Sequence, residues 1–161
     1  MTDTVVYPIP DHFSEAHVTP ERYHTLYRQS LDDPDTFWSE QAQLLDWHSP
    51  WSAVSETDFA KGATRWFVDA KLNVSVNCID RHLPERAHDT AIIWEGDDPD
   101  DSQSFTYQEL KIQVCRFANA LRAQGIGKGD RVCIYMPMIP EAAFAMLACA
   151  RIGAIPVSYT H

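Results

Sequence analysis

A run of six residues, Gly125-Ile-Gly-Lys-Gly-Asp130, combines three glycines with a lysine, which are the residue types that cradle phosphate groups. A phosphate-binding loop leaves a strand and opens a helix, so that helix N-terminal amides face the anion, and Ser or Thr follows its lysine. Here a predicted helix ends before the run, a predicted strand begins after it, and glycine follows the lysine. The run therefore predicts a turn, and phosphate binding is disfavoured.

The segment Met136-Pro-Met-Ile-Pro140 has the strand-to-helix order that a nucleotide site needs. It contains no glycine, however, and its two prolines lack the backbone N–H groups that would donate to a phosphate. This junction is not expected to hold a pyrophosphate.

Two sets of side chains, an acidic stretch and the histidines, contain residue types that can bind a metal ion. Asp97, Asp98, Asp100 and Asp101 could attract a divalent cation, but they miss the EF-hand spacing and lack its central glycine, so a solvated loop is expected. The histidines show no H-x-x-x-H or H-E-x-x-H pairing; they are His12, His17, His24, His48, His82, His88 and His161. No metal site is predicted.

The cysteines and serines form no motif that is typical of a catalytic nucleophile. Cys78, Cys115, Cys133 and Cys149 form no C-x-x-C pair, so we expect buried free thiols rather than a redox or zinc motif. No G-x-S-x-G elbow is present. The residues alone therefore predict no catalytic, cofactor-binding or metal-ligating side chain in this sequence.

Charge narrows the range of partners. The 161 residues carry a net charge of −10, which disfavours nucleic acid and anionic membrane surfaces, because both require basic patches. Residues 1–60 hold eleven acidic side chains and two basic ones, while the remainder is nearly balanced. No secretory signal or apolar run of about 20 residues is present, so a cytoplasmic protein is expected.

The elements that would position any site begin with two aromatic helices. Thr19-Pro20 and Asp33-Pro34 are typical helix starts, and the second predicted helix carries Phe37, Trp38, Gln41, Leu44 and Leu45 on one side. Aromatic residues at this spacing more often form a packing or docking surface than a ligand-binding site. Residues 49–64 are interpreted as a connector, followed by a short extended piece, Arg65-Trp66-Phe67.

Further along, Asn73 is expected to cap a helix whose apolar side carries Val74, Cys78, Ile79 and Leu83, and which Pro84 ends. Residues 90–94 predict a strand, and a return strand near Ser104-Phe105 would make a hairpin with an acidic tip. Thr106 and Glu109 form a capping box, which predicts a helix ended by Gly125.

The last elements form a parallel unit. Residues 132–136 predict a buried strand, and residues 140–152 predict an alanine-rich helix ended by Gly153. With the apolar run that follows, they predict a right-handed βαβ unit, and hence an α/β fold class.

Several specific segments carry a family resemblance over about residues 19–155. They are Asp35-Thr-Phe-Trp38, Leu72-Asn-Val-Ser-Val-Asn-Cys-Ile-Asp-Arg-His-Leu83, Ala91-Ile-Ile-Trp-Glu-Gly-Asp-Asp98, Val114-Cys-Arg-Phe-Ala-Asn119, Gly129-Asp-Arg-Val132, Tyr135-Met-Pro-Met-Ile-Pro-Glu-Ala142 and Leu147-Ala-Cys-Ala-Arg-Ile-Gly-Ala154. Together they resemble the AMP-forming acetyl-coenzyme A synthetases of the adenylate-forming superfamily. The related propionyl-CoA synthetases share much of this pattern.

The resemblance implies a ligase in which acetate attacks the α-phosphate of ATP to give acetyl-AMP and pyrophosphate, and the thiol of CoA then displaces AMP. It implies ATP, CoA and Mg²⁺ for the intact enzyme. The family places its phosphate loop, acyl pocket, CoA-binding arginines and catalytic lysine downstream of the region matched here. We therefore expect an inactive N-terminal fragment that binds none of these cofactors and whose partner is the missing C-terminal part.

The implied organisation has three parts. Residues 1–83 would be the helical N-terminal extension, and residues 84–155 would be the truncated start of the large AMP-binding domain, with its first β-hairpin and βαβ segment. Residues 156–161 depart from the family and resemble one reading frame of a transposon-end sequencing adaptor, which predicts a foreign tail. A propionate–CoA ligase fragment and a non-catalytic protein-interaction module that binds through the Trp38 and Trp47 region remain alternatives.

Overall fold

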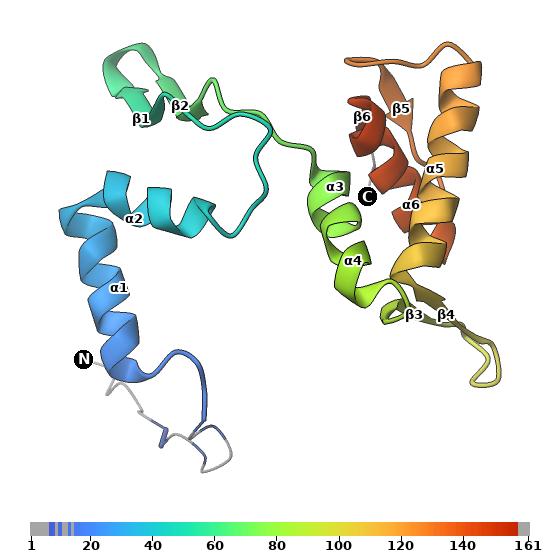
Figure 1. The fold of residues 1–161 in the computed structure, drawn as a ribbon, viewed down its shortest axis with the longest axis horizontal. Helices are drawn as coiled ribbons and strands as arrows, with labels where there is room; N and C mark the ends of the chain where they lie inside the picture. Colours follow the sequence, from blue (N-terminus) through green and yellow to red (C-terminus); the bar gives the residue numbers. More distant parts are fainter. Residues whose placement is uncertain (1–6, 9, 11–12, 14, 158–161) are drawn as a thin grey trace, which may run out of the picture. The chain divides into compact units, whose positions relative to one another are not determined.

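The computed structural model describes residues 7, 8, 10, 13 and 15–157 (Figure 1). The chain divides into two compact units, one up to Leu44 and one from Leu45 onward. Helices alternate with three two-stranded sheets in the described part of the chain. This mixture confirms the predicted α/β class.

The first unit contains the two predicted helices, α1 (Pro20–Asp32) and α2 (Pro34–Ala42). The Thr19 hydroxyl accepts the Arg22 N–H at 3.3 Å, and the Asp33 carboxylate accepts the Thr36 N–H at 3.1 Å. Each cap satisfies an amide that the first helical turn leaves unpaired, and each is followed by a proline that needs no partner. Both helix starts are therefore confirmed.

The second helix is shorter than its pattern suggested. It ends at Ala42, so Leu44 and Leu45 lie beyond the helix and are exposed rather than continuing its apolar stripe. On α1, the Tyr23 and Tyr27 rings stack with centroids 6.0 Å apart, and both side chains are exposed. The aromatic faces of this unit thus remain open to solvent.

The second unit opens with an antiparallel hairpin, β1 (Ala53–Asp58) and β2 (Ala63–Val68), joined by the 3₁₀ turn η2 (Phe59–Lys61). The prediction of a connector over residues 49–64 is therefore wrong. The hairpin turn depends on Gly62, whose φ of 63° is a left-handed value that glycine adopts without steric cost. Beside it, the rings of Trp47, Trp51 and Phe67 contact one another with centroids 5.2–5.3 Å apart.

Three short helices follow, α3 (Val74–Cys78), η3 (Asp80–His82) and α4 (Leu83–Arg86). Asn73 caps α3 as predicted, since its side-chain oxygen accepts the Ser75 N–H at 2.9 Å. The predicted apolar side is confirmed only in part: Ile79 is fully buried, but Val74 and Cys78 are exposed, and the polar residues Ser75 and Asn77 are buried instead. Pro84 also lies in the first turn of α4, where its missing N–H costs nothing, so it helps to begin a helix rather than end one.

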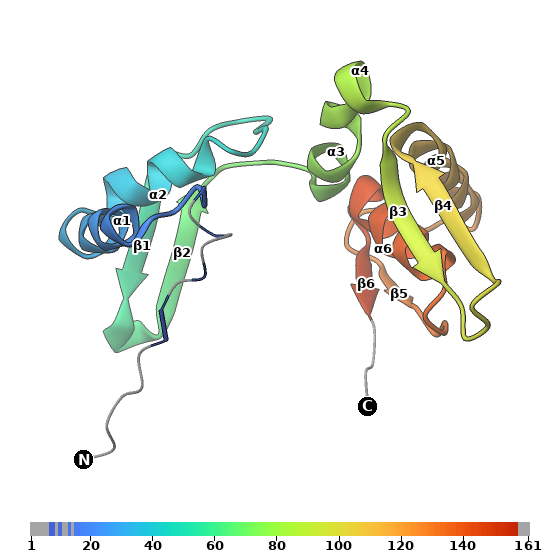
Figure 2. The same cartoon turned by 90° about the horizontal axis from the view of Figure 1, so that it is seen from below.

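The predicted acidic hairpin is formed by β3 (Thr90–Glu95) and β4 (Ser102–Thr106), which pair antiparallel and lie against α5 (Tyr107–Ala123) (Figure 2). The capping box that starts α5 is confirmed. Glu109 N–H donates to the Thr106 hydroxyl at 3.2 Å, and Thr106 N–H donates to the Glu109 carboxylate at 2.8 Å. These two bonds hold the turn from strand to helix.

The last elements are β5 (Arg131–Cys133), α6 (Pro140–Ile152) and β6 (Ile155–Val157). The two strands are parallel, as predicted. A strand is present where residues 132–136 predicted one, but it is shorter and is not buried: pairing stops after Cys133, and Tyr135 is 99% exposed. Within the described part of the chain, β5 pairs with β6 alone, which leaves it largely uncovered. Pro156 and Val157 of the predicted foreign tail belong to β6, and its other residues lie outside those described.

The main core lies between α5 and α6. Six buried side chains form it, namely Ile79, Leu110, Val114, Ala118, Phe144 and Ala148. The Phe105 ring of β4 meets Phe144 edge to face, with centroids 5.2 Å apart. Ile79 and Val114 are fully buried, and each such side chain contributes about 1.5–3 kcal/mol of hydrophobic stabilisation. This core fixes the ends of α5 and α6 relative to each other.

Candidate functional site

The glycine run lies in the turn between α5 and β5, as its order predicted. Gly125 and Gly129 adopt positive φ values of 84° and 89°. The Gly127 N–H donates to the Asp130 carboxylate at 2.8 Å, so the chain's own anion occupies an amide that a phosphate would need. The hydrogen bond within the turn stabilises the turn itself and leaves this amide unavailable to a phosphate.

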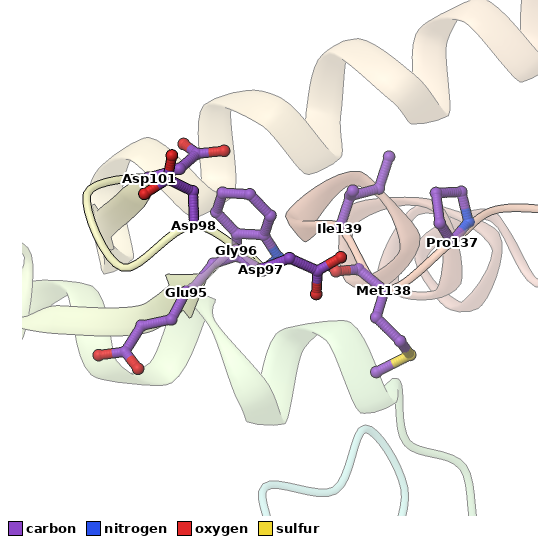
Figure 3. Close-up of a pocket in the computed structure, with 9 residues that line it drawn as sticks. Glu95, Gly96, Asp97, Asp98, Asp101, Pro137, Met138 and Ile139 are labelled. Carbon is purple, nitrogen blue, oxygen red and sulfur yellow. The ribbon is translucent and has the colours of Figure 1, made fainter.

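A hollow of about 440 Å³ lies where the turn of the acidic hairpin meets the segment before α6. Figure 3 shows Gly96, Asp97 and Asp98 on one side of it and the Pro137–Ile139 segment on the other. The indole N–H of Trp94 donates to the Met138 carbonyl at 2.7 Å and joins the two sides. The structure thus places together two regions that the sequence suggested separately, the carboxylates and the proline-rich junction.

The carboxylate loop is organised by bonds within the loop itself. Gly96 N–H donates to the Asp101 carbonyl at 2.7 Å, and Asp100 N–H donates to the Asp98 carboxylate at 3.0 Å. In the part of the chain that is described, no three His, Cys, Asp or Glu side chains are grouped so that they could hold a metal ion. The loop has the geometry of a tight, solvated turn.

The strongest charged cluster was not predicted from the sequence. The Asp80 carboxylate accepts a hydrogen bond from Lys111 Nζ of α5 at 2.6 Å, and its other oxygen pairs with Arg151 Nη2 in the last turn of α6. We call these three residues the Asp80 cluster. Burial alone would raise the pKa of Asp80, but the hydrogen bonds and charges of Arg151 and Lys111 outweigh it and lower that pKa below its usual 3.8.

Two side-chain amides join the same region. The Asn73 amide donates to the carbonyls of Ala150 and Arg151, at 3.0 and 3.2 Å, so one side chain caps both the start of α3 and the end of α6. Asn77 exchanges hydrogen bonds with the backbone of Asp46, at 2.8 and 3.0 Å. Ionic and polar contacts therefore bind residues 73–80 to the α5–α6 core. This arrangement positions helices.

The cysteines differ from one another in exposure. All four are free thiols, as expected, but the prediction that they are buried holds only for Cys149. Cys78 and Cys133 are exposed and Cys115 is half-buried, because α3 is a single short turn and β5 has one neighbour. Burial raises the pKa of the Cys149 thiol. Among the described residues, no helix is both long and apolar enough to cross a membrane.

Two family sequence models match successive parts of this chain. Residues 23–78 match the acetyl-coenzyme A synthetase N-terminus, and residues 79–160 match the AMP-binding enzyme family. The junction between the two matches falls between Cys78 and Ile79, inside the region that the Asp80 cluster and Asn73 hold together.

Curated relatives agree with this division. The chain is similar to acetyl-coenzyme A synthetase 2 of Pseudomonas putida, with 66% identity over 87% of the chain and 22% of that protein. It is 60% identical to acetyl-coenzyme A synthetase of Alkalilimnicola ehrlichii over 96% of the chain and 24% of that protein. Among solved structures, an acetoacetyl-CoA synthetase from Streptomyces lividans matches with a TM-score of 0.77 and 32% identity, over 92% of this chain and 23% of that one. The chain spans about a quarter of the length of these relatives.

Proposed function

Because this chain belongs to the AMP-binding enzyme family, we propose that it is the N-terminal part of an acetate–CoA ligase. In the intact enzyme, acetate attacks the α-phosphate of ATP, pyrophosphate leaves, and the thiol of CoA displaces AMP from acetyl-AMP to form acetyl-CoA. The observation that carries the proposal is the pair of consecutive matches over residues 23–160, together with 66% identity to an acetyl-coenzyme A synthetase.

Neither the glycine turn nor the strand-to-helix junction before α6 fits the phosphates of a nucleotide. Pro137 and Pro140 remove amide donors at the strand-to-helix junction before α6, and Asp130 occupies the amide of Gly127 in the glycine turn. We therefore propose that ATP, CoA, acetate and Mg²⁺ bind to other parts of the polypeptide. In this proposal no residue of the chain has a catalytic, cofactor-binding or metal-ligating role, and the chain alone is inactive.

The proposed role of this chain is structural. Residues 1–83 form an extension that docks on the body of the enzyme, and residues 84–155 begin its large domain. The exposed rings of Tyr23, Tyr27 and Trp38 support a docking role, because large aromatic side chains left in solvent are typical of surfaces that become covered. The partner is the remainder of the same polypeptide, and the proposed location is the cytoplasm.

A chimaera tests this function. Residues 20–157 of this chain replace the matching segment of the Pseudomonas putida relative, and acetate-dependent exchange of pyrophosphate into ATP is measured. We expect exchange within about tenfold of the unmodified relative, because at 66% identity most side chains that meet the rest of the enzyme should be unchanged. A folded chimaera without acetate-dependent exchange would contradict the proposal.

The chain by itself provides the second measurement. Purified residues 1–161 should show no acetate-dependent exchange, and any such activity would refute the proposed inactivity. A propionate–CoA ligase origin is an alternative that the chimaera does not address, because the relative supplies the acyl pocket. A non-catalytic interaction module would instead give an inactive chimaera, together with a stoichiometric partner that is lost when Trp38 is changed to Ala.

A further inference from the structure

A pocket of about 340 Å³ lies between the C-terminal halves of α5 and α6 and is separate from the acidic hollow. Cys115, Ala118, Asn119 and Arg122 line it from one face of α5, at spacings of three and four residues, and Arg151 and Ile152 line it from α6. No acidic residue is among these six. A basic pocket is a distinctive feature in a chain whose net charge is −10.

Its two arginines retain unused donors. The Nε atom of Arg151 is buried and has no hydrogen-bond partner among the described residues, although Nη2 is engaged with Asp80. Arg122 is exposed and forms no ion pair within the described part of the chain. A buried donor without a partner is costly, so a shift of the Arg151 side chain that brings Nε to an acceptor would lower the free energy of the folded state.

Positive charge also remains in excess around the pocket. Asp80 divides its single negative charge between Arg151 and Lys111, so the Asp80 cluster carries a net charge of +1. Arg122 adds another positive charge at the pocket wall. A second anion placed between the two guanidinium groups would therefore be attracted.

Arginines near helix C-termini often serve to pair the last carbonyls or the helix dipole. Here other groups pair those carbonyls. At the end of α6, the Asn73 side chain and the backbone N–H groups of Gly153 and Ala154 donate to carbonyls of the last turn. At the end of α5, the backbone N–H groups of Gln124, Gly125 and Ile126 do the same. The hydrogen-bond donors of the two arginines are not needed for capping.

We propose that this pocket binds a small oxyanion of the phosphate class, held between Arg122 and Arg151 with the Asn119 amide as a further donor. Guanidinium groups present paired N–H donors that match phosphate oxygens, and a tetrahedral anion can accept from three donor groups at once. The pocket lies at the far end of α6 from the Pro140 junction, about 20 Å along a 13-residue helix. It is thus a site distinct from any at that junction, and it does not rest on the proposed ligase function.

The test is a titration of the 161-residue chain with inorganic phosphate, monitored through amide NMR shifts, with the ionic strength held constant by chloride. Saturable shifts are expected for amides of residues 115–122 and 151–153. Arg122→Ala should weaken phosphate binding about tenfold, the loss expected for a charge-assisted hydrogen bond. Methyl phosphate is titrated in the same way. If it binds as tightly as inorganic phosphate, the natural ligand is the phosphate group of a larger molecule; if it binds more weakly, the natural ligand is the free ion.

The matched control is Arg116→Ala, which removes the same charge from an exposed position of the same helix outside the pocket. It should change the affinity by no more than about twofold, because a charge outside the pocket acts only through screened solvent. Arg122→Lys, which keeps the charge and loses the paired donors, should give an intermediate affinity. The proposal is overturned if the shifts do not saturate, or if the Arg116 and Arg122 alanine variants weaken binding equally.

Discussion

Replacing Asp80 with Asn removes the negative charge from the Asp80 cluster while keeping the size of the side chain. Lys111 and Arg151 then remain as two cations that are only 34% and 20% exposed, with an amide between them. The amide oxygen accepts one hydrogen bond where the carboxylate accepted two. The variant therefore leaves partly buried positive charge without compensation.

The expected cost lies between two limits. Breaking a fully buried ion pair by removing one partner costs about 3–5 kcal/mol, while an exposed pair contributes about 0–1 kcal/mol. Since these side chains are mostly but not fully buried, Asp80→Asn should lower the free energy of unfolding by about 2–3 kcal/mol. For a chain of this length, that corresponds to a melting temperature lower by roughly 5–10 °C.

Urea unfolding followed by tryptophan fluorescence measures this change. The matched control is Asp89→Asn, because Asp89 pairs with Arg86 at 2.9 Å in an exposed setting, with side chains 55% and 49% exposed. That variant should cost no more than about 1 kcal/mol. If the two variants unfold at the same urea concentration, the argument that burial gives the Asp80 cluster its importance is refuted.

Three further predictions follow from local features. Thr106→Ala should lower the free energy of unfolding by about 0.5–2 kcal/mol, because the capping box of α5 is lost, and Thr106→Ser should restore most of it in thermal unfolding. Cys78 and Cys133 should react with a thiol reagent at pH 8 within the mixing phase, whereas Cys149, buried and with a raised pKa, should react only on unfolding; equal rates would contradict the burial. The pKa of Asp80 is depressed in the folded state, so its contribution to the free energy of unfolding should be fully present above pH 3.8, its ordinary pKa. That contribution should be lost as the pH falls through the lower folded-state pKa. When the free energy of unfolding is measured against pH, Asp80→Asn should therefore show a smaller acid-induced loss than the unmodified chain.

Local signals in the sequence predicted elements well where one side chain decides the backbone. Thr19, Asp33, Asn73 and Thr106 each accept an amide N–H at a helix start, and this choice depends on a few neighbouring residues. The parallel pairing of β5 with β6 was also predictable, because a strand, a helix and a second apolar run fit few topologies.

Elements that depend on distant partners were missed. β1 is polar along most of its length, and its pairing with β2 rests on a turn without the usual two-residue glycine signal, so no alternation of apolar residues marked it. The buried residues of α3 are Ser75 and Asn77, and the Asn77 amide donates to the backbone carbonyl of Asp46, 31 residues away. No short-range pattern announces a polar residue whose partners are backbone groups elsewhere.

The charged contacts in the α5 and α6 region were missed for a similar reason. Lys111 and Arg151 lie 31 and 71 residues from Asp80, and in the sequence each of the three looks like an ordinary surface charge. Only the packing of α5 on α6 brings the two cations to one acid. The local spacing of apolar residues does not indicate such a contact, since the contact requires the tertiary arrangement itself.

The sharing of one carboxylate by two cations also has a consequence for the order of folding during synthesis. Lys111 leaves the ribosome 40 residues before Arg151, so Asp80 can close the 31-residue loop to α5 while α6 is still unmade. Closing the 71-residue loop directly would cost about 0.7 kcal/mol more in chain entropy. We therefore expect Lys111 to anchor residues 73–80 first and Arg151 to complete the cluster once α6 has been made.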